Sequence, residues 1–151
     1  MYGGYDDGSV LDQDPVELVC LLYAKAAEKL ALAQRLNDAS GVRPRAEAIA
    51  RAAEIVLELQ GSLDGERGGE IAVELARLYE YIQTRLAAGL AERANEPLAE
   101  AARLLETLAE GWRECRRELA SLSAAESPAR APLEAAEGEM ALAGASRVWT
   151  L

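Results

Sequence analysis

Apolar residues recur at alternating steps of three and four along residues 96–122, and no other feature of the sequence restricts the fold as strongly. The stripe consists of Leu98, Ala101, Leu105, Leu108, Trp112, Cys115, Leu119 and Leu122. Because an α-helix has about 3.6 residues per turn, this spacing places all of these side chains along one side of a helix. A helix with such a long apolar side has to pack lengthwise against other helices, so the pattern predicts a helical bundle.

Three earlier segments show helical periodicity and are separated by short turns. We expect helices over about residues 15–36, 45–63 and 70–90, in addition to 96–122. The first helix has a clear start, since Asp14 can cap it, Pro15 suits the first helical position and Glu17 completes a capping box. Short connections make helices that are neighbours in sequence antiparallel. The sequence therefore predicts an all-α protein, an antiparallel up-down four-helix bundle over residues 14–122.

The second and third segments carry more apolar residues than one buried face needs. The second has two neighbouring stripes, Ile49, Ala53, Val56, Leu63 and Ala48, Ala52, Ile55, Leu59. In the third, we expect the inward side chains to be Ile71, Leu75, Leu78, Ile82 and Leu86. Tyr79 and Tyr81 would then lie at the margins of that face.

Both ends of the chain differ in character from the helical segments. Residues 1–13 read as a flexible acidic arm that nevertheless carries Tyr2, Tyr5, Val10 and Leu11. Residues 123–151 read as a linker and tail, with a possible short helix over 132–143. Two alternatives remain open for this tail. It is either mobile, or docked on the bundle with Val148, Trp149 and Leu151 as an apolar plug.

The charge balance excludes several kinds of partner. A formal net charge of −10 would repel nucleic acid and anionic membranes. No apolar run approaches the ~20 residues of a membrane span, and the acidic N-terminus lacks the features of a signal peptide. We therefore expect a cytoplasmic protein without membrane insertion, with Cys20 and Cys115 reduced. A protein or peptide is the partner that this composition favours.

Residues for catalysis or for metal binding are scarce. The chain contains no histidine, which removes the commonest general base and a common metal ligand. In the glycine-rich stretch "GSLDGERGGE", residues 61–70, no lysine and no Ser or Thr follow the glycines as they do in a phosphate-binding loop, and the stretch carries three carboxylates. We interpret it as the connection between two helices. We expect no enzyme activity, no cofactor and no metal.

Several motifs together resemble the FliS family, the cytoplasmic export chaperone of flagellin. They are "DPVELVCLLYAKAAEKLALA", "AIARAAEIVLELQGSLDGERGGEIAVELARLYEYIQTRL" and "LLETLAEGW". The most specific positions are Ser62-Leu63-Asp64, Gly68-Gly69-Glu70-Ile71-Ala72, Leu75, Leu78-Tyr79, Tyr81 and Arg85-Leu86, in that order. The resemblance covers about residues 10–118. One departure is Ala88-Gly89, where the family commonly has Ala-Asn. We expect Gly89 to serve the same turn or capping role.

The resemblance implies a specific function, whereas the composition only permits it. Members of the family bind the disordered C-terminal segment of flagellin, prevent its premature polymerisation and assist its delivery to the flagellar type III export apparatus. Export-gate components or a flagellar regulator are possible further partners. The alternative is a helical-bundle adaptor or regulator that binds another flagellar-pathway protein. We expect a monomer or weak dimer in the absence of a client.

The candidate partner-binding residues are apolar positions on the second and third segments and on the arm. They are Tyr2, Tyr5, Val10, Leu11, Ile55, Leu59, Leu63, Ile71, Val73, Leu78, Tyr79, Tyr81 and Ile82. Each one on the helices either contacts a client or packs inside the bundle. By family resemblance, the arm could act as a lid over the client groove. A parallel hypothesis places Trp149 and Leu151 in that groove as a substitute for the client.

Overall fold

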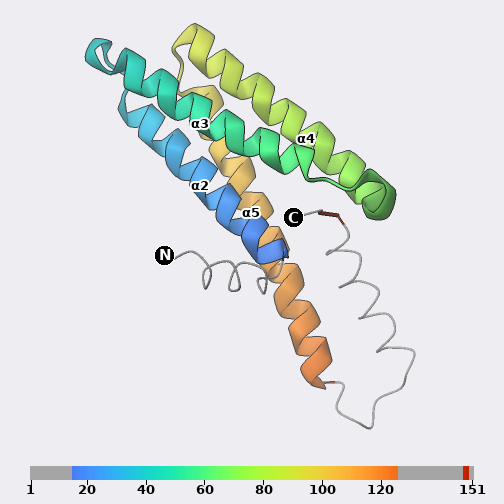
Figure 1. Ribbon diagram of the computed structural model, residues 1–151. Helices are drawn as coiled ribbons and strands as arrows, with labels where there is room; N and C mark the ends of the chain where they lie inside the picture. The colour runs from blue at the N-terminus through green and yellow to red at the C-terminus, as the bar shows by residue number, and fades with distance from the viewer. Residues whose placement is uncertain (1–14, 126–147, 150–151) are drawn as a thin grey trace, which may run out of the picture.

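The computed structural model in Figure 1 describes residues 15–125 and 148–149 of the chain. Its described elements are α2 (Pro15–Arg35), the 3-10 helix η1 (Ala39–Gly41), α3 (Val42–Gly61), α4 (Gly65–Glu92) and α5 (Glu96–Ala125). Helix α2 packs against α3 and α5, and α4 packs against the same two helices. Successive helices run in opposite directions (Figure 1). The expected all-α antiparallel four-helix bundle is confirmed.

Apolar side chains from all four helices, together with Val148 and Trp149, form the main core, and Val16 and Cys20 form a small second cluster beside Trp112. The largest fully buried side chains of the main core include Tyr23, Tyr79, Leu30, Leu59, Ile82, Leu86, Leu98 and Leu105. The apolar stripe of α5 is buried only in its first half. Leu122 is 45% exposed, because the last turns of α5 extend beyond the start of α2 (Figure 1). The expectation of one uninterrupted buried seam is therefore wrong at this end.

The start of α3 lies earlier than the expected residue 45. Asp38 accepts a hydrogen bond from the backbone N–H of Gly41 at 2.9 Å, which caps η1. Helix α3 then begins at Val42 and includes Pro44 in its first turn. Proline is tolerated there because the first N–H groups of a helix have no partner within it.

Helix α4 begins at Gly65, five residues before the expected start, and is kinked at Gly69. Asp64 caps the first turn by accepting from the N–H of Arg67 at 3.1 Å. Gly69 has φ 55° and ψ −133°, a combination that only glycine adopts without strain. The glycine pair therefore bends the entry to α4 after one complete turn.

The buried face of α4 differs from the expected one. It consists of Ala72, Leu75, Tyr79, Ile82, Leu86 and Gly89. Tyr79 is fully buried, so the expectation that it lies at the margin is wrong, and Ile71, expected inward, is 50% exposed. Both sets satisfy a helical spacing, and in the observed one the Tyr79 hydroxyl meets the Tyr23 hydroxyl inside the bundle.

Gly89 also differs from expectation, because it lies inside α4 and not in a turn. A Cβ atom at this position would lie 2.5 Å from Cδ2 of Leu98, so glycine permits α4 and α5 to approach closely. The residue that takes the left-handed conformation at the helix end is Arg93, with φ 52°. The N–H of Ala94 then donates to the Gly89 carbonyl at 3.2 Å.

Candidate functional site

Three aromatic residues form a hydrogen-bonded chain inside the bundle. The hydroxyl groups of Tyr23 on α2 and Tyr79 on α4 lie 2.7 Å apart, and Nε1 of Trp112 on α5 donates to the Tyr23 oxygen at 3.2 Å. Burial raises the pKa of Tyr23 to about 12, and burial also raises the pKa of Tyr79 above its usual value. Both hydroxyls are therefore protonated at neutral pH. This network stabilises the core and offers no basic group for catalysis.

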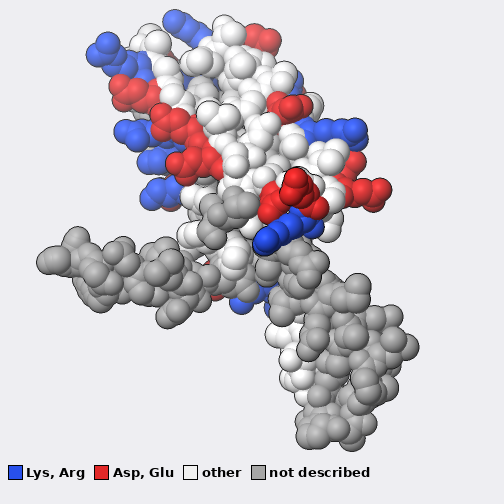
Figure 2. All heavy atoms as spheres, turned by 45° about the vertical axis from the view of Figure 1, so that its right-hand side comes forward, with Lys and Arg blue, Asp and Glu red and all other residues white. Residues whose placement is uncertain are grey.

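An open apolar groove runs between α4 and α5. It has a volume of about 680 Å³ and is lined by Glu70, Ile71, Glu74, Leu75, Arg77, Leu78 and Leu108. Its aliphatic lining residues are Ile71, Leu75, Leu78 and Leu108, and three charged side chains lie beside them. In the view of Figure 2, which brings the right-hand side of Figure 1 forward, uncharged residues form a broad area flanked by charged side chains. Such a groove suits the apolar face of a helical or extended segment.

A polar cluster lies farther along the same pair of helices. Tyr81 on α4 donates to Glu100 on α5, and Nε of Arg85 lies 2.6 Å from the same carboxylate. The hydrogen bond raises the pKa of Tyr81 and lowers the pKa of Glu100, with Arg85 adding to the second shift. Tyr81 is 43% exposed. Its ring is therefore held at the surface of α4, outside the groove.

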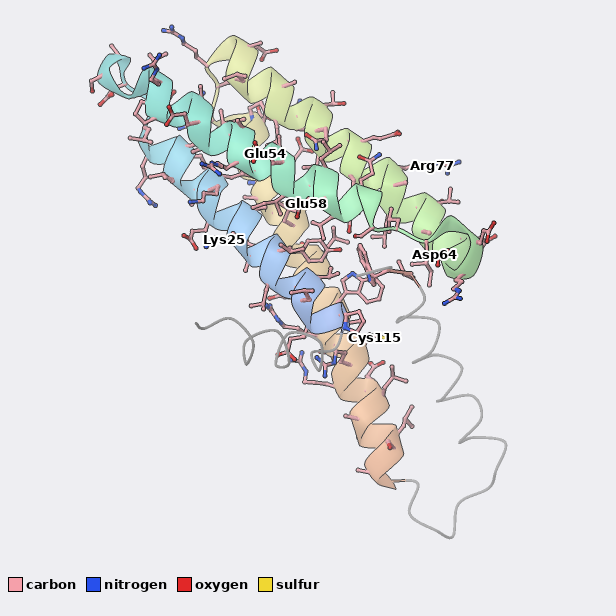
Figure 3. The ribbon with its side chains drawn as sticks, in the orientation of Figure 1. Lys25, Glu54, Glu58, Asp64, Arg77 and Cys115 are labelled. Atoms are coloured by element: carbon pink, nitrogen blue, oxygen red, sulfur yellow. The ribbon has the colours of Figure 1, made fainter. Side chains whose placement is uncertain are left out.

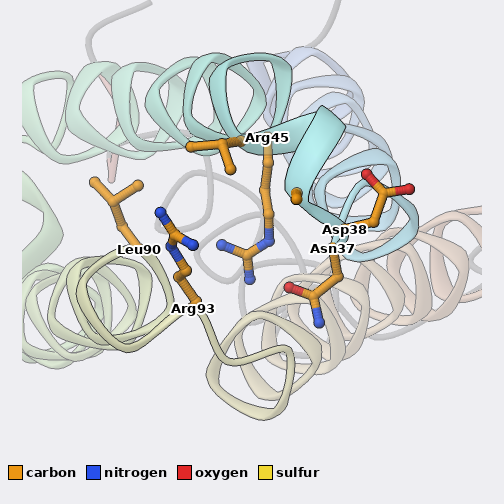
Figure 4. A pocket seen from close by; sticks show the side chains of 7 residues that line it. Asn37, Asp38, Arg45, Leu90 and Arg93 are labelled. Atoms are coloured by element: carbon orange, nitrogen blue, oxygen red, sulfur yellow. The ribbon is translucent and has the colours of Figure 1, made fainter.

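A smaller pocket of about 220 Å³ lies at the opposite end of the bundle, around Arg45 (Figure 4). Arg45 is buried, and its guanidinium donates to the carbonyls of Gly89 and Ala94 and to Oδ1 of Asn95. Nδ2 of Asn95 in turn donates to the Gln34 carbonyl at 3.0 Å. Arg45 therefore joins the ends of three helices, and its positive charge suits the C-terminus of α4. Sequence periodicity did not indicate this structural role.

The exposed faces of the bundle away from the groove also carry charged side chains. Lys25 on α2, and Glu54 and Glu58 on α3, are exposed and do not line the groove (Figure 3). Within the described residues, no group of His, Cys, Asp and Glu side chains is placed to hold a metal ion. No helix in that part of the chain combines the length and apolar character needed to cross a membrane.

Comparison with known proteins identifies the family. A family model described as "Flagellar protein FliS" matches residues 1–119. The chain belongs to the FliS family. It is 34% identical over 106 residues to the flagellar secretion chaperone FliSB of Pseudomonas aeruginosa, an alignment that covers 70% of this chain and 84% of the relative. It is 30% identical over 109 residues to the flagellar secretion chaperone FliS of Salmonella typhimurium, covering 72% and 81%.

The predicted binding residues of this FliS-family chain fall into distinct environments. Ile71 and Leu78 line the groove, and Tyr81 and Val73 are exposed outside it. Ile55 and Leu63 are half-buried against the core, and Leu59, Tyr79 and Ile82 are fully buried. The last three are inaccessible to a partner in this conformation. Tyr2, Tyr5, Val10 and Leu11 lie outside the described residues, as do residues 132–143.

Proposed function

We propose that this protein is a cytoplasmic flagellar secretion chaperone that binds the disordered C-terminal segment of flagellin. Binding would prevent premature polymerisation and assist delivery to the flagellar type III export apparatus, without catalysis. Family membership supports the chaperone role. The open apolar groove between α4 and α5 is the observation that supports binding of an apolar segment.

The energetics of folding upon binding require a surface of this kind. Ordering a disordered client costs about 2–5 kcal/mol or more, so the chaperone has to offer apolar area that the client can bury. Ile71 is 50% exposed beside Leu75, Leu78 and Leu108. Burying the rest of one aliphatic side chain contributes about 1 kcal/mol, and several such contacts offset the ordering cost.

Titration calorimetry with the C-terminal segment of the host's flagellin tests this function. Ile71→Glu should weaken binding at least about tenfold, because a charge replaces an apolar contact in the groove lining. Leu21→Glu is the matched control. Leu21 is 52% exposed on α2, a helix that packs against α3 and α5 but does not line the groove.

Two results would count against the proposal. If the flagellin segment does not bind the wild-type chain, flagellin is not the client. If Ile71→Glu and Leu21→Glu weaken binding equally, the groove is not the binding surface.

Sedimentation provides a further check of the proposed function. The free protein should sediment as a monomer, and the mixture with the flagellin segment should sediment as a one-to-one complex.

A further inference from the structure

The C-terminal segment places two side chains inside the bundle, although it follows α5 at a distance in the sequence. Val148 is fully buried and Trp149 is 5% exposed. The Trp149 ring lies beside two members of the core aromatic network, with centroid distances of 6.4 Å to Tyr79 and 6.1 Å to Trp112. We call this aromatic recess, formed by Leu63, Gly68, Tyr79 and Trp112, the Trp149 socket.

The socket also holds the backbone of its occupant. The N–H of Asp64 donates to the Val148 carbonyl at 2.7 Å, and Leu63 pairs with Trp149 in an antiparallel bridge. Asp64 lies at the corner between α3 and α4 (Figure 3). A Cβ atom on Gly68 would lie 3.2 Å from Cα of Val148, so glycine leaves room for the segment. One main-chain hydrogen bond and one deep side-chain recess are features that any extended apolar segment can use.

The fit of the present occupant is incomplete. Nε1 of Trp149 is buried and finds no hydrogen-bond partner among the described residues. A buried donor without a partner has lost its hydration with no compensation. This cost makes the docked state easier to displace than the packing of its ring would indicate.

The socket adjoins the apolar groove between α4 and α5. Leu75 lines the groove one helical turn before Tyr79, and Leu108 lines it one turn before Trp112. A segment lying in the groove can therefore continue into the socket. All four socket residues lie within residues 1–119, which match the FliS family, whereas Val148 and Trp149 lie beyond that match. The recess belongs to the shared bundle, and its occupant belongs to an extension of this chain.

We propose that the segment around Val148 and Trp149 is a built-in competitor that occupies one end of the client site and is displaced by an apolar residue of the client. The inference rests on the proposed function, because it names the regulation of the same binding surface. A tethered segment acts at an effective concentration of about millimolar, so even weak docking lowers apparent client affinity. If the segment is docked about 80–99% of the time, client affinity falls about 5- to 100-fold.

Titration of the flagellin C-terminal segment into the full chain and into Trp149→Ala tests the competition. Affinity should rise about 5- to 100-fold in the variant. Adding the peptide SRVWTL, the last six residues of the chain, should reverse the gain. Leu21→Ala, which shortens an exposed side chain on α2, should leave affinity unchanged. If folded Trp149→Ala binds the client no more tightly than the wild type, the competition is refuted while the chaperone function stands.

A second measurement on the wild-type chain remains decisive if Trp149→Ala fails to fold. The chain has two tryptophans, so the emission of Trp149 is the difference between wild type and the conservative variant Trp149→Phe. Client binding should shift this emission to longer wavelength as the indole enters water. Unchanged emission at saturating client overturns the proposal. Absence of client binding in every variant refutes the function and the competition together.

Discussion

Replacing Tyr23 with phenylalanine should destabilise the bundle more than replacing Tyr79 does. The Tyr23 oxygen is the centre of the network, since it contacts the hydroxyl of Tyr79 at 2.7 Å and Nε1 of Trp112 at 3.2 Å. Tyr23→Phe removes both hydrogen bonds and leaves the buried Tyr79 hydroxyl and the half-buried Nε1 of Trp112 without this partner. Tyr79→Phe removes one hydrogen bond and leaves the contact between Tyr23 and Trp112 in place.

The magnitudes follow from the cost of an unsatisfied buried group, about 1–3 kcal/mol each. We expect Tyr23→Phe to lower the free energy of unfolding by about 2–4 kcal/mol and Tyr79→Phe by about 1–2 kcal/mol. The double variant should cost at least about 1 kcal/mol less than the sum, because both single variants break the same hydrogen bond. Urea unfolding followed by circular dichroism at pH 7.5 measures all four members of the cycle.

Alkaline pH provides an independent test of the same network. The folded-state pKa of Tyr23 is about 12, raised by burial from the usual 10. The raised pKa contributes stability that is complete below pH 10 and is lost as the pH rises toward 12, about 3 kcal/mol in total. The double phenylalanine variant should lose less stability over that interval than wild type. Additive single variants, or identical pH profiles for wild type and the double variant, would refute the coupled network.

Three backbone positions give further predictions, each measured by urea unfolding. Gly69→Ala should lower stability by about 1–3 kcal/mol through its φ of 55°, whereas Gly61→Ala, where a Cβ atom meets nothing within 4 Å, should be nearly neutral. Gly89→Ala should cost about 1–3 kcal/mol, because the new methyl group would press on Leu98. Arg93→Gly should raise stability by up to about 1 kcal/mol, because glycine adopts the left-handed conformation without strain. An unchanged free energy of unfolding would show that Arg93 is not strained.

The fold could be predicted from the sequence because helix periodicity and turn residues agree along the chain. The starts at Pro15 and Glu96 follow directly from local signals, and the observed helices begin at those residues. The rotation of α4 could not be predicted in the same way. Two faces, one with Ile71 and Leu78 and one with Ala72 and Tyr79, fit the same spacing. In the observed face, Tyr79 meets a partner far away in sequence, the hydroxyl of Tyr23.

The candidate site was predictable only in part, for a related reason. An exposed apolar residue and a buried one look alike in a sequence, so Ile71 and Leu59 were equal candidates although one lines the groove and the other is fully buried. Arg45 shows the opposite case. A lone arginine usually indicates an exposed helix face, but here backbone carbonyls at the end of α4 surround it. Long-range partners decide both outcomes.

Occupancy of the Trp149 socket and stability of the bundle are linked, because Tyr79 and Trp112 belong both to the socket and to the core network. A ligand that binds only the folded protein stabilises it, and the gain is reduced by the free energy of any internal contacts that the ligand displaces. A client that displaces Trp149 forfeits the contacts of that ring, so it stabilises the bundle by the difference only. If the segment competes, a saturating excess of client should raise the melting temperature of the wild type less than that of Trp149→Ala, in step with its weaker apparent affinity for the wild type.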